Sequence, residues 1–533
     1  MRVRKASASI IWLLWLVCSC VAQSKVWVAD NGDGTYKNPI LHADYSDPDA
    51  IRVGDDFYLV ASSFNAAPGL PVLHSKDLVN WHIIGHVFAQ QPPAEHFSKP
   101  RHGGGVWAPA LRHRNGEFYL YYPDPDFGIY LAKAKNAAGP WSEPVLIKRA
   151  KGWIDPAPFW DDDGQAYLVS AFAGSRSGVK TVLIISRMSA DGTKLLDDGA
   201  IIFDGHDQDP TVEGPKLHKR NGYYYIFAPA GGVATGWQLV LRAKNIYGPY
   251  ERKVVLAQGK TAINGPHQGA WVETQTGESW FLHFQDKDAF GRVVHLQPMK
   301  WVDDWPQMGN NGEPVLRYRK PNVGKIYPIV TPPDSDEFNE PRLGLQWQWH
   351  ANPQPLWALP TGGNYGFLRL PCVPLPEDFA NYGDVPNLLL QKIPAPRFTA
   401  TTKVTFTPRA AGEKTGLIVS GLDYAYLAVT KRDNGLFATL ATGLDVEKRN
   451  PEQELARDIP VAGNTFYLRV SVDEKALCQF SLSADGAKFA PVGPPFQAKP
   501  GRWIGAKVGI FATRSTKRNG ETGYADFAWF RVE

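Results

Sequence analysis

The stretch GDDFYLV, residues 54–60, is the first of five similar segments in the N-terminal three hundred residues. Each segment joins a turn of Asp, Asn or Gly to a strand rich in aromatic and branched side chains, which is half of a β-hairpin. The others are NGEFYLYY from residue 115, DDGQAYLV from 162, NGYYYIF from 221 and GESWFLHF from 277. The central aromatic residues lie 61, 48, 58 and 56 residues apart; they are Tyr58, Tyr119, Tyr167, Tyr225 and Phe281.

A second turn-and-strand element follows each of these segments. The five elements are HSKDLVNW, AKAKNAAGPW, SRMSADGTKL, RAKNIYGPY and LQPMKWVDDW. Repetition at this period, with almost no helical periodicity, indicates four-stranded sheets arranged radially around an axis. The sequence therefore predicts a five-bladed β-propeller over residues 23–326. A single long β-sandwich would not explain why the turn motif recurs.

The repeat ends at a Pro-rich stretch that begins YPIVTPPDSDEF at Tyr327. We interpret residues 327–333 as a linker. Short alternating strands separated by Gly, Asp and Asn turns follow, among them FTATTKVTF and GLIVSGLDYAYLAVT. This pattern predicts a concanavalin-like antiparallel β-sandwich over residues 334–533, so that the whole chain is all-β.

The N-terminus has the features of a targeting segment. Three cations precede an uncharged run from Ile10 to Cys18, which is far shorter than the roughly 20 apolar residues of a membrane span. We interpret residues 1–22 as a cleaved signal peptide and expect an exported protein without a membrane span. The stretch Val17-Cys18-Ser19-Cys20 loosely resembles a lipoprotein cleavage box, so a lipid anchor on Cys20 stays open as an alternative.

The charge of the mature chain is nearly balanced. Of 57 Lys and Arg, three lie in the leader, which leaves 54 against 53 Asp and Glu. A balanced surface without runs of Lys and Arg argues against a nucleic-acid partner. Only Cys372 and Cys478 remain after the leader, and spacing alone leaves open whether they pair or stay as buried thiols. The oligomeric state does not follow from the sequence.

In a propeller, equivalent positions of the blades form a ring around the axis. Counting back 11 to 14 residues from each central aromatic residue gives five such positions, namely Asp47, Trp107, Asp155, Glu213 and His267. Three of the five are carboxylates in the contexts SDPD, IDPAP and VEGPK. Asp-Pro and Glu-Gly are common in turns, but the shared register predicts that these carboxylates meet at one mouth.

Other acidic residues nearby fall outside this register. Asp44, Asp49, Asp55, Asp56 and residues 161–163 are therefore expected to serve turns or solvated faces. The three carboxylates in register suit the cleavage of a glycosidic bond, in which one carboxylic acid protonates the leaving oxygen and a carboxylate acts on the opposite side of the sugar. The third carboxylate would tune the pKa of the acid, because a like charge nearby raises that pKa and keeps the acid protonated.

Five stretches in chain order resemble the blade motifs of glycoside hydrolase family 43. They are YSDPDAIRVGDDFYLVASSF, GGVWAPAL, WIDPAPFWDDDGQAYLV, VEGPKLHKRNGYYYIF and HFQDKDAFGRVVHLQP. The C-terminal region is similar to the sandwich of the β-xylosidase and α-L-arabinofuranosidase members. The resemblance implies an exo-acting, inverting glycosidase that acts on arabinose- or xylose-containing plant cell-wall polysaccharides or oligosaccharides.

The resemblance also implies roles for individual residues. It makes Asp47 the general base, Asp155 the pKa tuner and Glu213 the general acid. Phe64 and Trp107 match positions that pack against the terminal sugar, and the alternative is that both fill the propeller core. Arg292 matches an arginine that reaches the sugar hydroxyls.

His267 matches a central histidine that supports a calcium or sodium ion through water in similar proteins. The alternative is a hydrogen-bonded polar side chain in the central channel, and no organic cofactor is expected. In the sandwich, Trp347, Trp349 and His350 either stack on sugars or fill the inner face of a strand.

Two other functional classes stay open at this point. One is a carbohydrate-binding propeller without catalysis, against which the intact Asp47, Asp155 and Glu213 argue. The other is a retaining hydrolase of the fructan-cleaving propeller type. Those enzymes have Cys after the acid, whereas here Gly214 and Pro215 follow Glu213.

Overall fold

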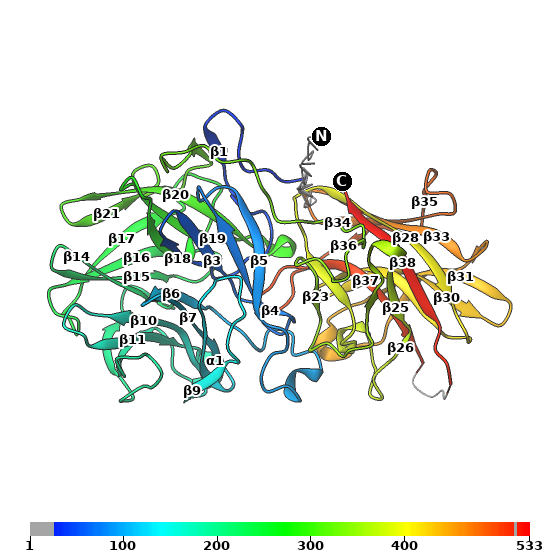
Figure 1. Cartoon of the computed structure of the whole chain (residues 1–533), viewed down its shortest axis with the longest axis horizontal. Helices are drawn as coiled ribbons and strands as arrows, with labels where there is room; N and C mark the ends of the chain where they lie inside the picture. Colours follow the sequence, from blue (N-terminus) through cyan, green and yellow to red (C-terminus); the bar gives the residue numbers. More distant parts are fainter. Residues whose placement is uncertain (1–25, 516–519) are drawn as a thin grey trace, which may run out of the picture.

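The computed structural model describes residues 26–515 and 520–533. Figure 1 shows two β-rich bodies side by side, a propeller formed by the N-terminal part of the chain and a sandwich formed by the C-terminal part. The predicted leader, residues 1–22, lies outside the described residues. Within the described part, no helix is long and apolar enough to cross a membrane.

Five antiparallel sheets of four strands form the propeller, and each sheet follows the order of the chain. The first two blades are β2 (Asp49–Val53), β3 (Asp56–Val60), β4 (Gly69–Ser75) and β5 (Trp81–Phe88), then β6 (Ala110–Arg114), β7 (Glu117–Asp124), β8 (Gly128–Ala134) and β9 (Val145–Arg149). The next two are β10 (Trp153–Trp160), β11 (Ala166–Phe172), β12 (Val182–Met188) and β13 (Ala200–Asp204), then β14 (Lys216–Arg220), β15 (Tyr223–Ala230), β16 (Trp237–Ala243) and β17 (Glu251–Ala257). The last is β18 (His267–Glu273), β19 (Ser279–Asp286), β20 (Arg292–Val302) and β21 (Trp305–Met308). The predicted five-bladed propeller is confirmed.

The repeated motif is the first hairpin of each blade. In the second blade, Asn115 and Gly116 have φ values of 52° and 76°, as a two-residue type I′ turn requires. The turn joins Arg114 to its cross-strand partner Glu117. The five central aromatic residues all lie on second strands, which explains why this part of the sequence repeats most clearly.

The N-terminal segment ties the ring together. Strand β1 (Thr35–Lys37) pairs with β22 (Arg317–Arg319), which follows the last blade. Tyr36 is fully buried and donates its hydroxyl hydrogen to the carbonyl of Leu296 at 2.7 Å. The first segment of the domain is thus fastened to the last blade.

The second body is a sandwich of two eight-stranded sheets, as expected. One contains β23 (Gln348–Trp349), β26 (Val373–Pro374), β27 (Leu389–Lys392), β29 (Lys414–Ser420), β30 (Tyr424–Arg432), β31 (Gly435–Gly443), β32 (Gln453–Val461) and β37 (Lys507–Arg514). The other contains β24 (Leu359–Pro360), β25 (Leu368–Pro371), β28 (Phe398–Thr407), β33 (Thr465–Val472), β34 (Leu477–Ser483), β35 (Ala490–Pro491), β36 (Phe496–Gln497) and β38 (Tyr524–Val532). Short helices interrupt the strands at α1 (Gly174–Ser177), η1 (His96–Ser98), η2 (Asp288–Phe290), η3 (Gly362–Asn364), η4 (Tyr382–Asp384) and η5 (Val446–Lys448).

The sandwich core answers two questions that the sequence left open, namely the role of its two tryptophans and the pairing of its two cysteines. Trp347 and Trp349 are 2% and 6% exposed and pack among the buried side chains, so they fill the interior rather than present a sugar-binding face. Cys372 and Cys478 are both buried and free, so they form no disulfide.

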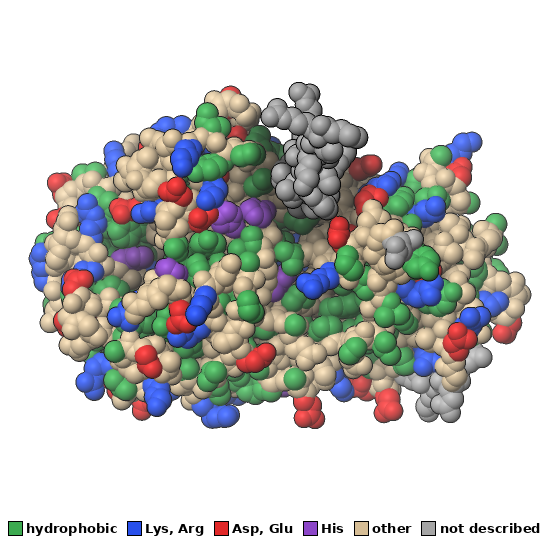
Figure 2. All heavy atoms as spheres, viewed as in Figure 1, with side chains coloured by type: hydrophobic (Ala, Val, Ile, Leu, Met, Phe, Trp, Pro, Cys, Tyr) green, Lys and Arg blue, Asp and Glu red, His purple; other side chains and the backbone are tan. Residues whose placement is uncertain are grey.

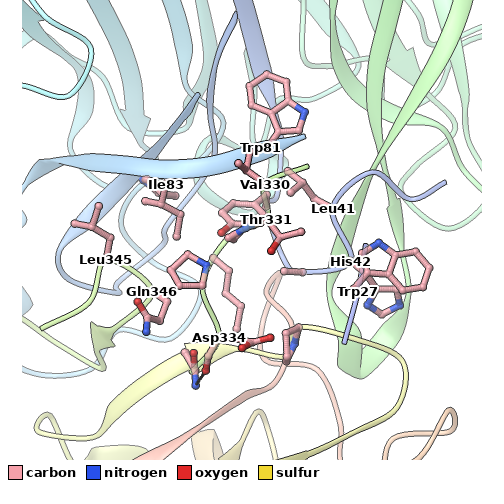
Figure 3. Close-up of a pocket in the computed structure, with 18 of the residues that line it drawn as sticks. Trp27, Leu41, His42, Trp81, Ile83, Val330, Thr331, Asp334, Leu345 and Gln346 are labelled. Carbon is pink, nitrogen blue, oxygen red and sulfur yellow. Dashed lines mark hydrogen bonds between the residues drawn. The ribbon is translucent and has the colours of Figure 1, made fainter. Parts of the chain in front are cut away.

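A small cavity of about 50 Å³ lies where the two bodies meet (Figure 3). Trp27, His42 and Trp81 line it from the propeller, and Asp334 and Gln346 line it from the sandwich. It is large enough for water but does not include the predicted site residues. On the face shown in Figure 2, cationic and anionic side chains are interspersed, with no broad patch of one sign.

Two of the acidic residues expected on turns or solvated faces are buried. Asp44 is 2% exposed and Asp49 is 1% exposed. Asp49 accepts hydrogen bonds from Arg112 Nη1 at 2.7 Å and from the backbone N–H of Leu111 at 2.8 Å. The expectation was wrong for both residues. Asp49 lies at the start of β2, a first strand that packs against its neighbours around the axis, and Asp44 accepts the backbone N–H of Arg292 from the last blade at 2.8 Å.

Asp49→Asn is expected to lower the free energy of unfolding by about 3 kcal/mol, because it leaves the mostly buried guanidinium of Arg112 without a counter-charge. Urea unfolding at pH 7 measures the change. Asp162→Asn is the control, since the Asp162 side chain is 87% exposed in its ion pair with Lys219, and it should change little. Equal effects of the two substitutions would contradict the structural role of Asp49.

Candidate active site

The candidate site forms at one end of the first strands of the blades. Strand β2 lies against β18 and β6, and β10 lies against β6 and β14. The chain enters these strands from the same end of the propeller. Asp47 and Glu213 lie just before β2 and β14, and Asp155 lies near the start of β10. Positions far apart in the sequence are thereby brought around one axis.

A cavity of about 480 Å³ opens at this end. Its wall includes the six residues predicted to be catalytic or to bind substrate, which are Asp47, Phe64, Trp107, Asp155, Glu213 and Arg292. The three carboxylates thus face one space large enough for a monosaccharide unit.

Two donors hold the carboxylate of Asp47. Arg292 Nη1 donates to Oδ1 at 3.0 Å, and Ser62 Oγ donates to Oδ2 at 2.6 Å. The same Arg292 nitrogen donates to Ser46 Oγ at 3.0 Å. Asp47 and Arg292 are each 7% exposed, so their ion pair is shielded from bulk water. The carboxylate is therefore fixed in one orientation toward the cavity.

Asp155 and Glu213 form a second carboxylate group. Asp155 Oδ2 accepts a hydrogen bond from the backbone N–H of Gly214 at 2.7 Å, which places it directly beside the Glu213 backbone. Burial, followed by the charge of Glu213, raises the pKa of Asp155 to about 7. Glu213 Oε1 lies 2.8 Å from His267 Nε2, and the Glu213 side chain is 29% exposed. Glu213 is thus the member of the pair that reaches open space.

The backbone at the site is held in an uncommon conformation. Asp47, Phe64, Asp155 and Gln268 have φ values of 54°, 51°, 55° and 41°, in the left-handed region that non-glycine residues rarely adopt. The ladder is irregular between Ile154 and Ala157 and between His267 and Gly269. Such bulges redirect side chains, and here they occur where Asp155 and Gln268 turn toward the cavity.

Gly214 allows the close approach of three strands. Its φ is 57°, and a Cβ atom there would lie 2.6 Å from Gln268 Oε1 and 3.1 Å from Pro229 Cδ. The residue after Glu213 must therefore be glycine for the Gln268 side chain to lie against it.

The two predicted sugar-stacking residues come from adjacent segments. Phe64 forms a β-bridge with Val106, and Trp107 follows directly. Trp107 Nε1 donates to the carbonyl of Gly103 at 2.8 Å, which fixes the indole. Phe64 is 2% exposed, so it forms the floor of the cavity as well as part of the core.

His267 lies beside the cavity rather than in its wall. It is fully buried, and its Nδ1 has no hydrogen-bond partner among the described residues. In the described part of the chain, no group of three or more His, Cys, Asp and Glu is placed to hold a metal ion. These residues do not fit a directly coordinated calcium ion, and the water-mediated ion stays a prediction.

Gln268 and Trp503 are among the residues of the cavity wall that sequence reasoning missed. Gln268 follows His267, but its side chain reaches the cavity only because of the bulge. Trp503 comes from the sandwich, is 45% exposed, and its ring centroid lies 6.4 Å from that of Trp107. Nothing in the repeat pattern points to Trp503, because the contact between the domains is not a local feature of the sequence.

Carboxylates around a cavity bordered by aromatic side chains are typical of a glycoside hydrolase. Residues 36–306 match the family described as Glycosyl hydrolases family 43, and residues 335–533 match the Beta xylosidase C-terminal Concanavalin A-like domain. The chain belongs to glycosyl hydrolase family 43 and is a glycosidase.

Individual relatives extend over nearly the whole chain. A putative beta-xylosidase of Xylanibacter ruminicola is 40% identical over 500 residues, which are 92% of this chain and 88% of the relative. A non-reducing end alpha-L-arabinofuranosidase of Bacteroides ovatus is 29% identical over 93% of this chain and 94% of the relative. The solved xylan beta-1,4-xylosidase from Bacillus halodurans has a TM-score of 0.82 at 28% identity, with 93% of this chain and 99% of that chain covered.

The raised pKa of Asp155 has a consequence for stability. The ordinary Asp pKa of about 3.9 applies to the unfolded chain, so the folded protein binds this proton more tightly. The free energy of unfolding therefore falls as the pH rises from about 4 to about 7. Asp155→Asn removes the titrating group, and its amide oxygen can still accept from the Gly214 N–H.

The quantity to compare is the free energy of unfolding of Asp155→Asn minus that of wild type. This difference should be at least about 1 kcal/mol more positive at pH 8 than at pH 4, because only the wild type loses stability when Asp155 ionises. Urea unfolding at the two pH values measures this difference, and Asp162→Asn serves as the exposed control. A difference between variant and wild type that does not change with pH would contradict the burial of a proton on Asp155.

Proposed function

We propose that the protein is an exo-acting, inverting glycosidase that removes terminal β-D-xylosyl or α-L-arabinofuranosyl residues from plant cell-wall polysaccharides or their oligosaccharides. The names of the relatives support both activities, since one is a putative beta-xylosidase and another an alpha-L-arabinofuranosidase. The two sugars present similar hydroxyl groups, so one pocket can serve either. We further propose that the chain is exported through its N-terminal leader.

The observation that carries the proposal is the position of Asp47, Asp155 and Glu213 in the wall of one cavity. A terminal sugar would enter this cavity and contact Phe64 and Trp107. Trp503 from the sandwich narrows the cavity on one side, which favours a closed pocket for the end of a sugar chain over an open cleft.

In the proposed mechanism, Asp47 is the general base. Arg292 and Ser62 orient its carboxylate, which takes a proton from a water molecule as that water attacks the anomeric carbon. In inverting enzymes the two catalytic carboxyl groups stand about 6.5–9.5 Å apart, so that the water fits between them.

Glu213 is the proposed general acid. It gives its proton to the oxygen of the departing sugar, and His267 holds the carboxyl group at 2.8 Å. Asp155 lies beside Glu213 as the proposed tuner, and burial, followed by the charge of Glu213, raises the pKa of Asp155 to about 7. After the reaction, Asp47 releases its proton to solvent and Glu213 takes one up from solvent.

Glu213→Gln should lower kcat/KM about 10²–10⁴-fold on xylobiose or an arabinofuranosyl oligosaccharide. It should lower kcat/KM far less on a dinitrophenyl pentoside, because that leaving group needs little protonation. Asp47→Asn should lower the rate on both substrates alike, since attack by water is needed in either case. Initial rates on the paired substrates measure the difference.

Glu273→Gln, an exposed residue at the far end of β18, is the matched control and should act like wild type. Equal losses of Glu213→Gln on the two substrates would contradict its role as the acid. Absence of hydrolysis by the wild type on every xyloside and arabinofuranoside would refute the proposed substrate class.

A further inference from the structure

A short segment of the sandwich, residues 503–507, reaches the propeller beside the candidate site. We call it the clasp. Its first residue, Trp503, lines the cavity, and its last residue, Lys507, begins β37. Between them, the backbone N–H of Ala506 donates to the carbonyl of Ala289 at 2.8 Å. The clasp therefore bonds to the turn that joins β19 to β20.

That turn leads directly into Arg292. Within it, the N–H of Gly291 donates to the carbonyl of Asp288 at 2.9 Å, and the N–H of Lys287 donates to the carbonyl of Gly291 at 2.9 Å. Arg292 is the next residue, and its guanidinium holds Asp47. A shift of the turn would move this arginine, because only one peptide unit separates it from Gly291.

Gly505 of the clasp packs directly on Gly291. A Cβ atom at position 505 would lie 2.8 Å from both the Cα and the N of Gly291, and 3.0 Å from the carbonyl carbon of Phe290. Real Cβ atoms essentially never come that close to backbone atoms. Gly505 has no left-handed φ, so the contact itself, and not backbone conformation, requires glycine.

Charge connects the clasp to the same arginine from a second side. Asp44 Oδ1 accepts the backbone N–H of Arg292 at 2.8 Å. Lys507 is buried and its cross-strand partner Lys392 is half-buried, and both interact electrostatically with Asp44. The sandwich thus supplies two lysine side chains that interact with the carboxylate on which Arg292 rests.

We propose that the clasp is a positioning element for Arg292, with the Gly505–Gly291 contact setting where the arginine meets Asp47. This inference rests on the proposed function and assigns the sandwich a part in the chemistry beyond closing the pocket. Trp503 touches the cavity, whereas Gly505 and Lys507 act through Arg292.

Gly505→Ala tests the steric contact. Its Cβ must push the turn away, so kcat/KM for an aryl xyloside or aryl arabinofuranoside should fall about tenfold or more. Gly501→Ala is the matched control. Gly501 lies just before the clasp, and a Cβ atom there would meet only Ile504, with the side-chain Cγ2 at 2.7 Å, and no residue of the propeller. The control should keep wild-type kinetics, and circular dichroism and Tm establish that both variants fold.

A double-mutant cycle separates positioning from a general loss of structure. In an Arg292→Lys background, Gly505→Ala should cause little further loss, because the residue through which it acts is already altered. Losses that multiply in the combined variant would overturn the proposal, as would wild-type kinetics of Gly505→Ala alone.

Lys507→Met is a second variant for the case that Gly505→Ala does not fold. It keeps the volume of the side chain and removes the amino group that interacts with Asp44, so kcat/KM should fall several-fold. In the Arg292→Lys background it should again cause little further loss. Unchanged kinetics of Lys507→Met would overturn the proposal in that case. If instead the wild type hydrolyses no pentoside, the proposed function fails before the clasp is tested.

Discussion

The structure depends on holding three carboxyl groups around one small cavity. Like charges in a shielded space repel each other, and burial adds to the cost of ionisation. The surrounding residues offset that cost with Arg292 and Ser62 on Asp47, the Gly214 N–H on Asp155 and His267 on Glu213. The Asp47 carboxylate is thereby kept beside a cation, while burial favours a bound proton on Asp155. A base and an acid are separated by their surroundings and not by residue type.

Much of this could be predicted from the sequence, because the information is local. The Asn115-Gly116 turn dictates a hairpin by its backbone preference alone, and its recurrence in related form gives the number of blades. Rotational equivalence then transfers a position in one blade to the next, which brings Asp47, Asp155 and Glu213 together without any knowledge of long-range contacts. The resemblance to family 43 supplied the individual roles, and the family itself is now established.

The rest depended on contacts that no local pattern encodes. Asp44 and Asp49 were expected on turns or solvated faces, yet both are buried, because Asp49 lies on a first strand near the axis and Asp44 contacts the last blade. Gln268 enters the cavity through a bulge. Trp503 lies more than two hundred residues from any other wall residue, and the packing of Gly505 on Gly291 requires both domains to be in place. Contacts between domains of this kind cannot be predicted from a local sequence pattern.

The central claim is that a water molecule held by Asp47 attacks the sugar while Glu213 protonates the leaving group. Proton NMR of the first sugar released from a xyloside or arabinofuranoside, recorded before mutarotation, tests this claim most directly. Inversion of the anomeric configuration is the result that the account predicts. Retention would mean that a carboxylate attacks the sugar itself, and would contradict the role of Asp47 as a base.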